Sequence, residues 1–294
     1  MNKTNIIKGY VYSLLSAVLF GCMPLMAKYI YAEGVNSLSL VFLRNLIALP
    51  GLAALAVMKQ KTLKTTGKMF LMTGIPSFFG MTLTAILLFS SYQYLASGTA
   101  TVFHFIYPSL VVLLSVIFLK KKMNITMLVS IAMCFAGIMT FYSPQNKLHP
   151  AGVVLALASG LTYAIYIVML PLFQNEGNRG FYFSFYITLW SVILMLPICL
   201  CTNQLTLPST IRGWVLCAIF SLSVSIGATV LFQEGAYIIG GEKTAIVSTL
   251  EPITGLVIGM LVFQEKCQPF TIIGALLVVA ASILIAVQDL DDST

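Results

Sequence analysis

The fold is decided by two stretches of sequence that lie 144 residues apart. Residues 103–119 read FHFIYPSLVVLLSVIFL, and residues 247–263 read VSTLEPITGLVIGMLVF. Both are apolar, both carry a proline soon after an ionisable residue, and both are followed by a polar stretch. Because proline lacks a backbone N–H and disturbs the bond to the carbonyl four residues earlier, we expect helix kinks at Pro108 and Pro252. The two stretches therefore predict a protein with two similar halves.

The composition around these stretches indicates that most of the chain lies in lipid. Of the 294 residues, 59% are hydrophobic and only 9% are charged, and the mean hydropathy is +0.97. Soluble domains have roughly 45–50% apolar residues and about 25% charged residues. So few charges could not cover the surface of a soluble enzyme, and the high apolar content excludes a disordered chain. The sequence therefore predicts an integral membrane protein without a separate soluble domain.

Ten apolar segments, separated by polar residues or by Gly and Pro, predict ten transmembrane helices. At a rise of about 1.5 Å per residue, each can cross the hydrocarbon core of a bilayer with some tilt. The first segment is longer than the core of a signal peptide and lacks a cleavage pattern, so we interpret it as an uncleaved helix. The expected spans are 9–31, 38–58, 69–94, 98–119, 124–142, 151–173, 181–201, 211–238, 244–263 and 269–287.

The order of the matching segments indicates an internal repeat. The first and sixth spans also align, with Phe20 against Tyr163. The halves 1–146 and 147–294 would then hold five helices each. Because five is an odd number of crossings, the second half begins on the opposite side of the membrane and is inserted upside down. The alternative is that apolar helices of restricted composition align by chance. We predict an all-α integral membrane protein of ten transmembrane helices in two inverted five-helix repeats, which is a transporter architecture.

The positive charges predict how the protein is oriented. Eleven Lys or Arg residues lie at the N-terminus or in loops on the same side, and three lie on the other side. Because loops rich in Lys and Arg stay in the cytoplasm, we expect both termini to be cytoplasmic in a multi-pass protein of the cytoplasmic (inner or plasma) membrane. The net charge of +7 thus reflects orientation. The sequence contains no basic run interleaved with aromatics, so no nucleic-acid partner is expected.

The sequence contains no motif for a metal, a cofactor or ATP. The six cysteines form no CxxC pair and have no zinc-like spacing with histidine. The phosphate-binding loop GxxxxGKS/T is absent, so ATP is not expected to drive transport within this chain. The HExxH or paired-aspartate motifs of a membrane-embedded lipid enzyme are absent too. We therefore predict a protein that is not an enzyme and uses no cofactor.

Three short motifs resemble those of a known family of carriers. Residues 107–110 (YPSL), 250–252 (LEP) and 42–44 (FLR) are similar to motifs of the drug/metabolite transporter superfamily, in its ten-helix type with two EamA-like halves. The first half departs from the pattern because its fourth span ends in three lysines, 120–122, rather than in a Gly-Glu pair. The resemblance implies a small-molecule carrier that works by alternating access around a central cavity. Relatives export amino acids and other metabolites, take up small organic cations, or exchange nucleotide sugars.

Ionisable side chains are costly inside a bilayer, so those at membrane depth are the first candidates for function. His104 and Glu251 are the deepest, and His104 shares one helix face with Tyr107. By the repeat, Ser248 and Glu251 occupy the equivalent face of the ninth span. The two prolines should free the carbonyls four residues before them to bind a ligand, an ion or water. We expect the substrate site to consist of Phe20, His104, Tyr107, Tyr163, Tyr166, Ser248 and Glu251.

Each charged candidate also has a structural interpretation. Glu251 either binds substrate or pairs with Arg44 or Lys28 to hold helices together. His104, whose reference pKa is about 6.5, either carries a proton or is a neutral helix contact. Glu234 is near the end of its span and Arg44 is early in its span, so both can reach the interface. The candidates for proton or charge coupling are His104, Glu234, Glu251 and Arg44.

Together these features predict a secondary active transporter of a small metabolite, an amino acid or related amine, that works as an exporter or exchanger. Aromatic rings with one carboxylate also suit a cation, so uptake of a small organic cation such as a quaternary amine is the alternative. The spacing Gly255-x-x-x-Gly259 permits close contact with another helix. The oligomeric state expected from the sequence is a monomer or a homodimer. The expected partners are a small-molecule substrate and the lipid bilayer.

Overall fold

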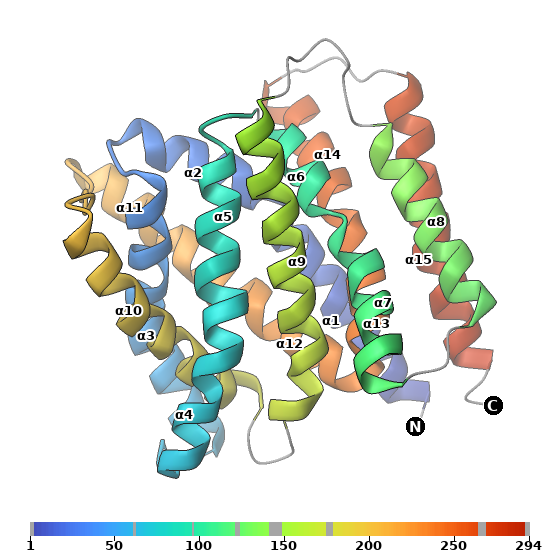
Figure 1. Cartoon of the computed structure of the whole chain (residues 1–294), viewed down its shortest axis with the longest axis horizontal. Coiled ribbons are helices and arrows are strands. Elements are labelled where there is room, and N and C mark those ends of the chain that lie inside the picture. The colour runs from blue at the N-terminus through green and yellow to red at the C-terminus, as the bar shows by residue number, and fades with distance from the viewer. Residues whose placement is uncertain are drawn as a thin grey trace.

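The computed structural model describes residues 3–60, 63–95, 97–120, 124–140, 149–174, 179–263 and 269–291. Helices make up most of this part of the chain and form a single bundle (Figure 1). The elements in chain order are α1 (Lys3–Gly21), α2 (Met23–Ala32), α3 (Ser37–Gln60), α4 (Gly67–Pro76), η1 (Ser77–Leu83), α5 (Thr84–Ser91), α6 (Ser97–His104), α7 (Tyr107–Leu119), α8 (Ile125–Met139), α9 (Pro150–Phe173), α10 (Gly180–Cys201), α11 (Ile211–Phe220), η2 (Ser221–Ala228), α12 (Thr229–Ile239), α13 (Gly241–Val247), η3 (Ser248–Leu250), α14 (Glu251–Phe263) and α15 (Pro269–Asp291).

Within the described chain, six helical segments are long and apolar enough to cross a membrane. They are Lys3–Ala32, Ser37–Lys59, Gly67–Ser91, Pro150–Phe173, Gly180–Cys201 and Ile211–Ile239. Three more of the expected spans contain the shorter apolar helices Tyr107–Leu119, Ile125–Gly137 and Ile272–Ala281. Large apolar side chains such as Phe118, Val154 and Leu222 are exposed on the outside, as contact with lipid requires. The fold is therefore an all-α multi-pass membrane fold, and the full number of ten crossings stays a prediction.

Helices are interrupted at the prolines of both repeated stretches. α6 ends at His104 and α7 begins at Tyr107, so Pro108 is the second residue of the new helix, where a missing N–H breaks no helical bond. In the ninth span the short 3-10 helix η3 separates α13 from α14, and Pro252 is again the second residue of the helix that follows. The same property of proline thus ends a helix at equivalent places in the two halves.

The third and eighth spans share a distortion that we did not predict from the sequence. Both contain a π-helix, η1 and η2, and the two begin 144 residues apart. Directly after each, a threonine hydroxyl donates to the carbonyl five residues earlier, at 2.7 Å for Thr84 and 3.0 Å for Thr229. π-turns are rare and occur mostly at functional sites. Their equivalent positions indicate that the two halves are built alike.

Contacts between the two halves repeat with the halves exchanged. The Ser77 hydroxyl donates to the carbonyl of Ile187 at 2.6 Å, and the Ser221 hydroxyl donates to the carbonyl of Arg44. The first bond joins the third span to the seventh, and the second joins the eighth span to the second. In the same way α1 packs on α12 while α9 packs on α5. A twofold axis between two similar halves would produce this pattern.

The path of the chain shows where the halves meet. α1 begins at the end of the bundle where both termini lie, whereas α9 begins at the opposite end (Figure 1). α3 packs on α10, and α8 packs on α15. The second contact is close: a Cβ on Gly137 would lie 2.6 Å from the carbonyl oxygen of Gly274, and a Cβ on Gly274 would lie 2.5 Å from that of Gly137. Between these two pairs lie α1, α9 and the interrupted helices α6–α7 and α13–α14 (Figure 1). The expected site residues come mainly from this central group.

Candidate functional site

Tyr163, in the middle of α9, is the centre of a cluster of aromatic side chains. The centroid of its ring lies 4.9 Å from that of Tyr107 and 5.5 Å from that of His104. The rings of Tyr166 and Phe232 are each 5.7 Å away. These distances are those of favourable aromatic pairs. The structure thus brings together side chains from α6, α7, α9 and α12, which belong to both halves.

Some of the expected site residues are accessible and others are buried. Phe20, on α1, packs against the aromatic cluster at its edge. The side chains that keep accessible surface are Phe20, Tyr163 and Glu251. Those that are buried are His104, Tyr107, Tyr166 and Ser248. The expected site thus combines three partly buried residues with four that are buried.

Three neighbours hold Tyr166 in place. Gly80, in the π-helix η1, lies against its ring, and a Cβ on Gly80 would be 2.4 Å from ring carbons. The Nε2 of Gln233 donates to the Tyr166 hydroxyl at 2.8 Å, and Ser184 donates to Oε1 of Gln233 at 2.6 Å. Neither Gln233 nor Gly80 was predicted from the sequence as a site residue. The signal for Gln233 was an amide in an apolar span beside Glu234, but nothing in the sequence pointed to the close approach at Gly80.

His104 has a defined orientation and tautomer. Its Nδ1 lies 2.8 Å from Oγ of Ser159, and that hydroxyl donates to the carbonyl of Ala156 at 2.6 Å. Because a hydroxyl has one hydrogen, Nδ1 must be the donor, and Nε2 of the neutral ring carries the lone pair. The side chain is buried and makes ring contacts with Tyr107 and Tyr163. Ser159 therefore fixes how the imidazole faces the cluster.

The carbonyls that the two prolines free do not face a ligand, contrary to our expectation. The carbonyl oxygen of His104 lies against Gly160 of α9, where a Cβ would be 2.7 Å away. The carbonyl of Ser248 accepts the N–H of Glu251 within the 3-10 turn. Protein atoms therefore cover the first carbonyl, and a backbone donor satisfies the second. The interruptions at the prolines shape helix packing rather than expose backbone oxygens.

Glu251 is the carboxylate at the aromatic cluster. Its chain neighbours Leu250 and Ile253 pack against the same apolar cluster as Tyr107 and Tyr163. Within the described chain, no ion pair joins it to Arg44. The hydroxyls of Tyr107 and Ser248 lie beside each other, and neither completes a hydrogen bond of good geometry. Buried polar groups without partners are costly, by about 1–3 kcal/mol each, so this place would gain from a polar ligand or water.

Arg44 lies inside the bundle, so the expectation that it extends to the membrane interface is wrong. Its side chain is only 7% exposed. The guanidinium carbon is 5.7 Å from the centroid of the Phe89 ring, and Nη1 is 4.0 Å from Sδ of Met23. The Nε of Arg44 has no hydrogen-bond partner among the described residues, which leaves a donor available.

Glu234 belongs to a different group of contacts. Its Oε2 lies 3.7 Å from Nη1 of Arg179, the residue that precedes α10. The guanidinium of Arg179 also lies over the ring of Tyr237, 4.4 Å from its centroid. The side chain of Glu234 is 19% exposed. The structure therefore places Glu234 in an ion pair near the start of α10, and not beside Tyr163.

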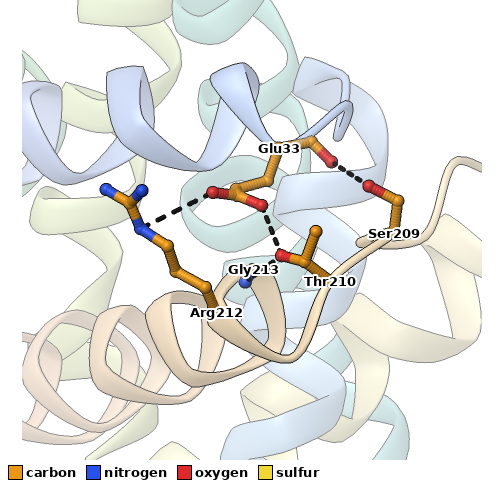
Figure 2. A network of polar contacts seen from close by, with 5 residues as sticks. All are labelled: Glu33, Ser209, Thr210, Arg212 and Gly213. Atoms are coloured by element: carbon orange, nitrogen blue, oxygen red, sulfur yellow. Dashed lines mark hydrogen bonds and ion pairs between the residues drawn. The ribbon is translucent and has the colours of Figure 1, made fainter.

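A polar network joins the two halves at one end of the bundle (Figure 2). Glu33, which follows α2, lies 3.6 Å from Nε of Arg212 and accepts a hydrogen bond from the Thr210 hydroxyl. The Ser209 hydroxyl donates to the carbonyl of Glu33 at 3.4 Å, and Thr210 caps α11 by accepting the N–H of Gly213 at 3.0 Å. Because the Arg212 side chain is 72% exposed, its ion pair contributes little. The hydrogen bonds tie the first half to the start of α11.

The described residues contain no group of three or more His, Cys, Asp or Glu side chains that could hold a metal ion. Cys199 and Cys217 are buried in one apolar cluster, and Cys134 is buried in another. The Sγ of Cys134 also lies 3.2 Å from the Thr249 hydroxyl. In these positions cysteine acts as a small apolar residue.

Comparisons with known proteins agree with this architecture. The EamA-like transporter family matches the chain twice, over residues 7–143 and 150–287. An uncharacterized transporter of Clostridium kluyveri is 19% identical over 289 residues, covering 94% of this chain and 92% of that protein. An uncharacterized transporter of Synechocystis is 28% identical over 226 residues, covering 74% and 67%.

A solved structure described as "Crystal structure of protein" has the same fold. It matches with a TM-score of 0.74 at 15% identity, over 95% of this chain and 96% of that chain. At this level of identity the likeness concerns the fold alone. The family matches, in contrast, rest on the sequence and cover nearly all of it. The chain therefore belongs to the EamA-like transporter family.

Proposed function

We propose that this membrane transporter is a secondary active carrier that exports or exchanges a small metabolite, an amino acid or a related amine. Family membership and the relatives named as transporters support transport rather than catalysis. We propose that substrate binds at the aromatic cluster around Tyr163. The proposed contact residues are Phe20, His104, Tyr107, Tyr163, Tyr166, Ser248 and Glu251.

We propose that the halves 1–146 and 147–294 work by alternating access. The exchanged hydrogen bonds of Ser77 and Ser221, each to a helix of the other half, support a twofold relation between them. The aromatic cluster draws on both halves. Rocking of one half against the other would open this place to each side of the membrane in turn.

The observation that carries the proposal is a carboxylate at membrane depth beside aromatic rings. Glu251 is only partly buried, its neighbours Leu250 and Ile253 pack against the same cluster as Tyr163, and it forms no ion pair with Arg44 in the described chain. The ammonium group of a substrate would supply a counter-charge, and the face of the Tyr163 ring would add a cation–π contact. We therefore propose Glu251 as the group that binds the substrate amine. It is also the first candidate for charge coupling, ahead of His104 and Glu234.

Uptake of a small organic cation, such as a quaternary amine, is the second candidate function. The accessible rings of Phe20 and Tyr163 favour it, because a quaternary ammonium binds ring faces and needs no hydrogen-bond acceptor. Direct comparison of amino acids with quaternary amines separates the two functions.

Counterflow into proteoliposomes tests the proposal. Purified protein is reconstituted with an unlabelled amino acid or amine inside the vesicles, and entry of the labelled compound is followed. We expect Glu251→Gln to lower the rate at least about tenfold, since it removes the charge that binds the amine. Glu33→Gln is the matched control, because Glu33 lies in the network at the end of the bundle. Full activity of a folded Glu251→Gln protein would refute this role.

We also propose that the protein lies in the cytoplasmic membrane with both termini in the cytoplasm. The excess of Lys and Arg on the side of the N-terminus supports this orientation. Fusion of a fluorescent protein or an alkaline phosphatase to the C-terminus tests it. Fluorescence without phosphatase activity is the expected result, and the reverse would contradict the orientation.

A further inference from the structure

Arg44 is a buried charge that the proposed function leaves unexplained. An amine carrier needs an anionic group, and Glu251 is sufficient for that. Yet Arg44 is 7% exposed, and its guanidinium lies beside the Phe89 ring and the sulfur of Met23. Burying a cation without a carboxylate partner costs free energy. A buried cation of this kind therefore suggests a function, such as binding an anionic group.

Arg44 and Glu251 approach the same short segment of chain from opposite halves. This segment is Gly21–Met23, where α1 ends and α2 begins. A Cβ on Gly21 would lie 2.6 Å from the carbonyl oxygen of Glu251, so α14 packs directly against this residue. Nη1 of Arg44 reaches Sδ of Met23 at 4.0 Å. The two charged residues therefore flank one break in the first span.

Tyr163 lies in the neighbourhood of both residues, near enough for either charge to influence its hydroxyl. The two charges are nevertheless not paired with each other in the described chain. A negative and a positive group that share their neighbours but remain apart match a ligand that carries both charges. A simple amine would satisfy Glu251 and leave Arg44 without a counter-ion.

We infer that Arg44 determines specificity by binding the carboxylate of a zwitterionic substrate whose ammonium group binds Glu251. This inference rests on the proposed amine-binding role of Glu251. A guanidinium suits the task because it can donate two parallel hydrogen bonds to one carboxylate, and the Nε of Arg44 lacks a partner in the described chain. The apolar part of the substrate then lies against the accessible rings of Phe20 and Tyr163.

The test compares ligands that differ only in charge. Binding of the common L-amino acids to the purified protein is measured by thermal shift and calorimetry. Each amino acid that binds is compared with its decarboxylated amine and its deaminated acid, for example phenylalanine with phenethylamine and 3-phenylpropionate. We expect the zwitterion to bind at least about tenfold more tightly than either analogue, since each analogue leaves one of the two charges, Arg44 or Glu251, without a partner.

Variants at the two charges should change the preference in opposite ways. Arg44→Gln should reduce the preference for the zwitterion over the amine to less than about threefold while amine binding persists. Glu251→Gln should do the same for the preference over the deaminated acid. Arg44→Lys keeps the charge but not the fork of donors, and should retain part of the preference. Arg212→Gln, in the network of Figure 2, is the control and should leave both preferences intact.

The wild-type protein alone can overturn the inference, even if the variants do not fold. Equal binding of the zwitterion and its amine would refute it and leave the proposed amine carrier standing. The same holds if amines bind and no amino acid does. Failure of both amino acids and amines to bind would overturn the proposed function together with this inference.

Discussion

Replacement of Gly80 by alanine is expected to destabilise the protein, although alanine is the better helix former. In a helix the change by itself would stabilise by about 0.5–1 kcal/mol. The new Cβ, however, would lie 2.4 Å from Cγ and Cδ2 of Tyr166 and 2.8 Å from Cδ1. Carbon atoms pack best at about 3.5–4.0 Å, so the ring must move by about 1 Å.

Moving this ring has two costs. Overpacking of a close-packed site costs about 1–3 kcal/mol. The shift also strains the 2.8 Å bond from Gln233 to the Tyr166 hydroxyl, which contributes about 1 kcal/mol. After the gain in helix propensity is subtracted, we expect a net loss of about 1–3 kcal/mol. For a chain of this size, this corresponds to a fall in the melting temperature of at least about 2 °C.

Thermal unfolding of the purified protein in detergent, followed by intrinsic fluorescence, measures the effect. Gly67→Ala is the matched control, because a Cβ there meets nothing within 4 Å and the residue starts α4. The double variant with Tyr166→Ala removes the ring, so Gly80→Ala should no longer be harmful in that background. Equal effects of the two glycine variants, or the same loss with and without the ring, would refute the proposed contact.

Three further predictions, with four variants, test other contacts. Gly160→Ala should destabilise the protein more than Gly80→Ala does, because its Cβ would lie 2.7 Å from the carbonyl oxygen of His104, and a backbone atom cannot rotate away as a side chain can. The yield of monodisperse protein in size-exclusion chromatography measures this effect. Ser77→Ala and Ser221→Ala should each destabilise by about 1 kcal/mol, with additive effects in thermal unfolding, and clearly unequal losses would contradict their equivalence. Gln233→Leu should destabilise by about 2 kcal/mol, because two buried hydroxyls lose their partner, and a neutral outcome in the same assay would mean that water replaces the amide.

Much of the fold could be predicted because the bilayer imposes strict rules on sequence. A segment that crosses lipid must be apolar and helical, so hydropathy marks the spans. The helix interruptions at Pro108 and Pro252 follow from the covalent structure of proline. The π-helices could not be predicted in this way. They depend on how threonine hydroxyls and neighbouring helices compete for backbone groups, and this competition exists only after the helices pack.

The candidate site was predictable in its residue types but not in its contacts. Glu251 and His104 stood out because ionisable groups are rare at membrane depth. One interpretation of the sequence placed Arg44 at the interface, since a long side chain early in a span can reach it, and only the packing of Phe89 and Met23 shows that it stays inside. Gln233 has no recognisable role until its amide is seen between two hydroxyls.

The sequence by itself determined that this chain lies in a membrane, that it repeats, and that its helices are interrupted near Pro108 and Pro252. These properties follow from local chemistry, namely the solvation of apolar segments and the missing N–H of proline. The tertiary structure alone decided that Arg44 and Glu251 flank one break in the first span without pairing, and that Tyr166 rests on Gly80. Such contacts join residues that are far apart in the chain, and a helical period specifies which face a residue shares but not which helix that face meets.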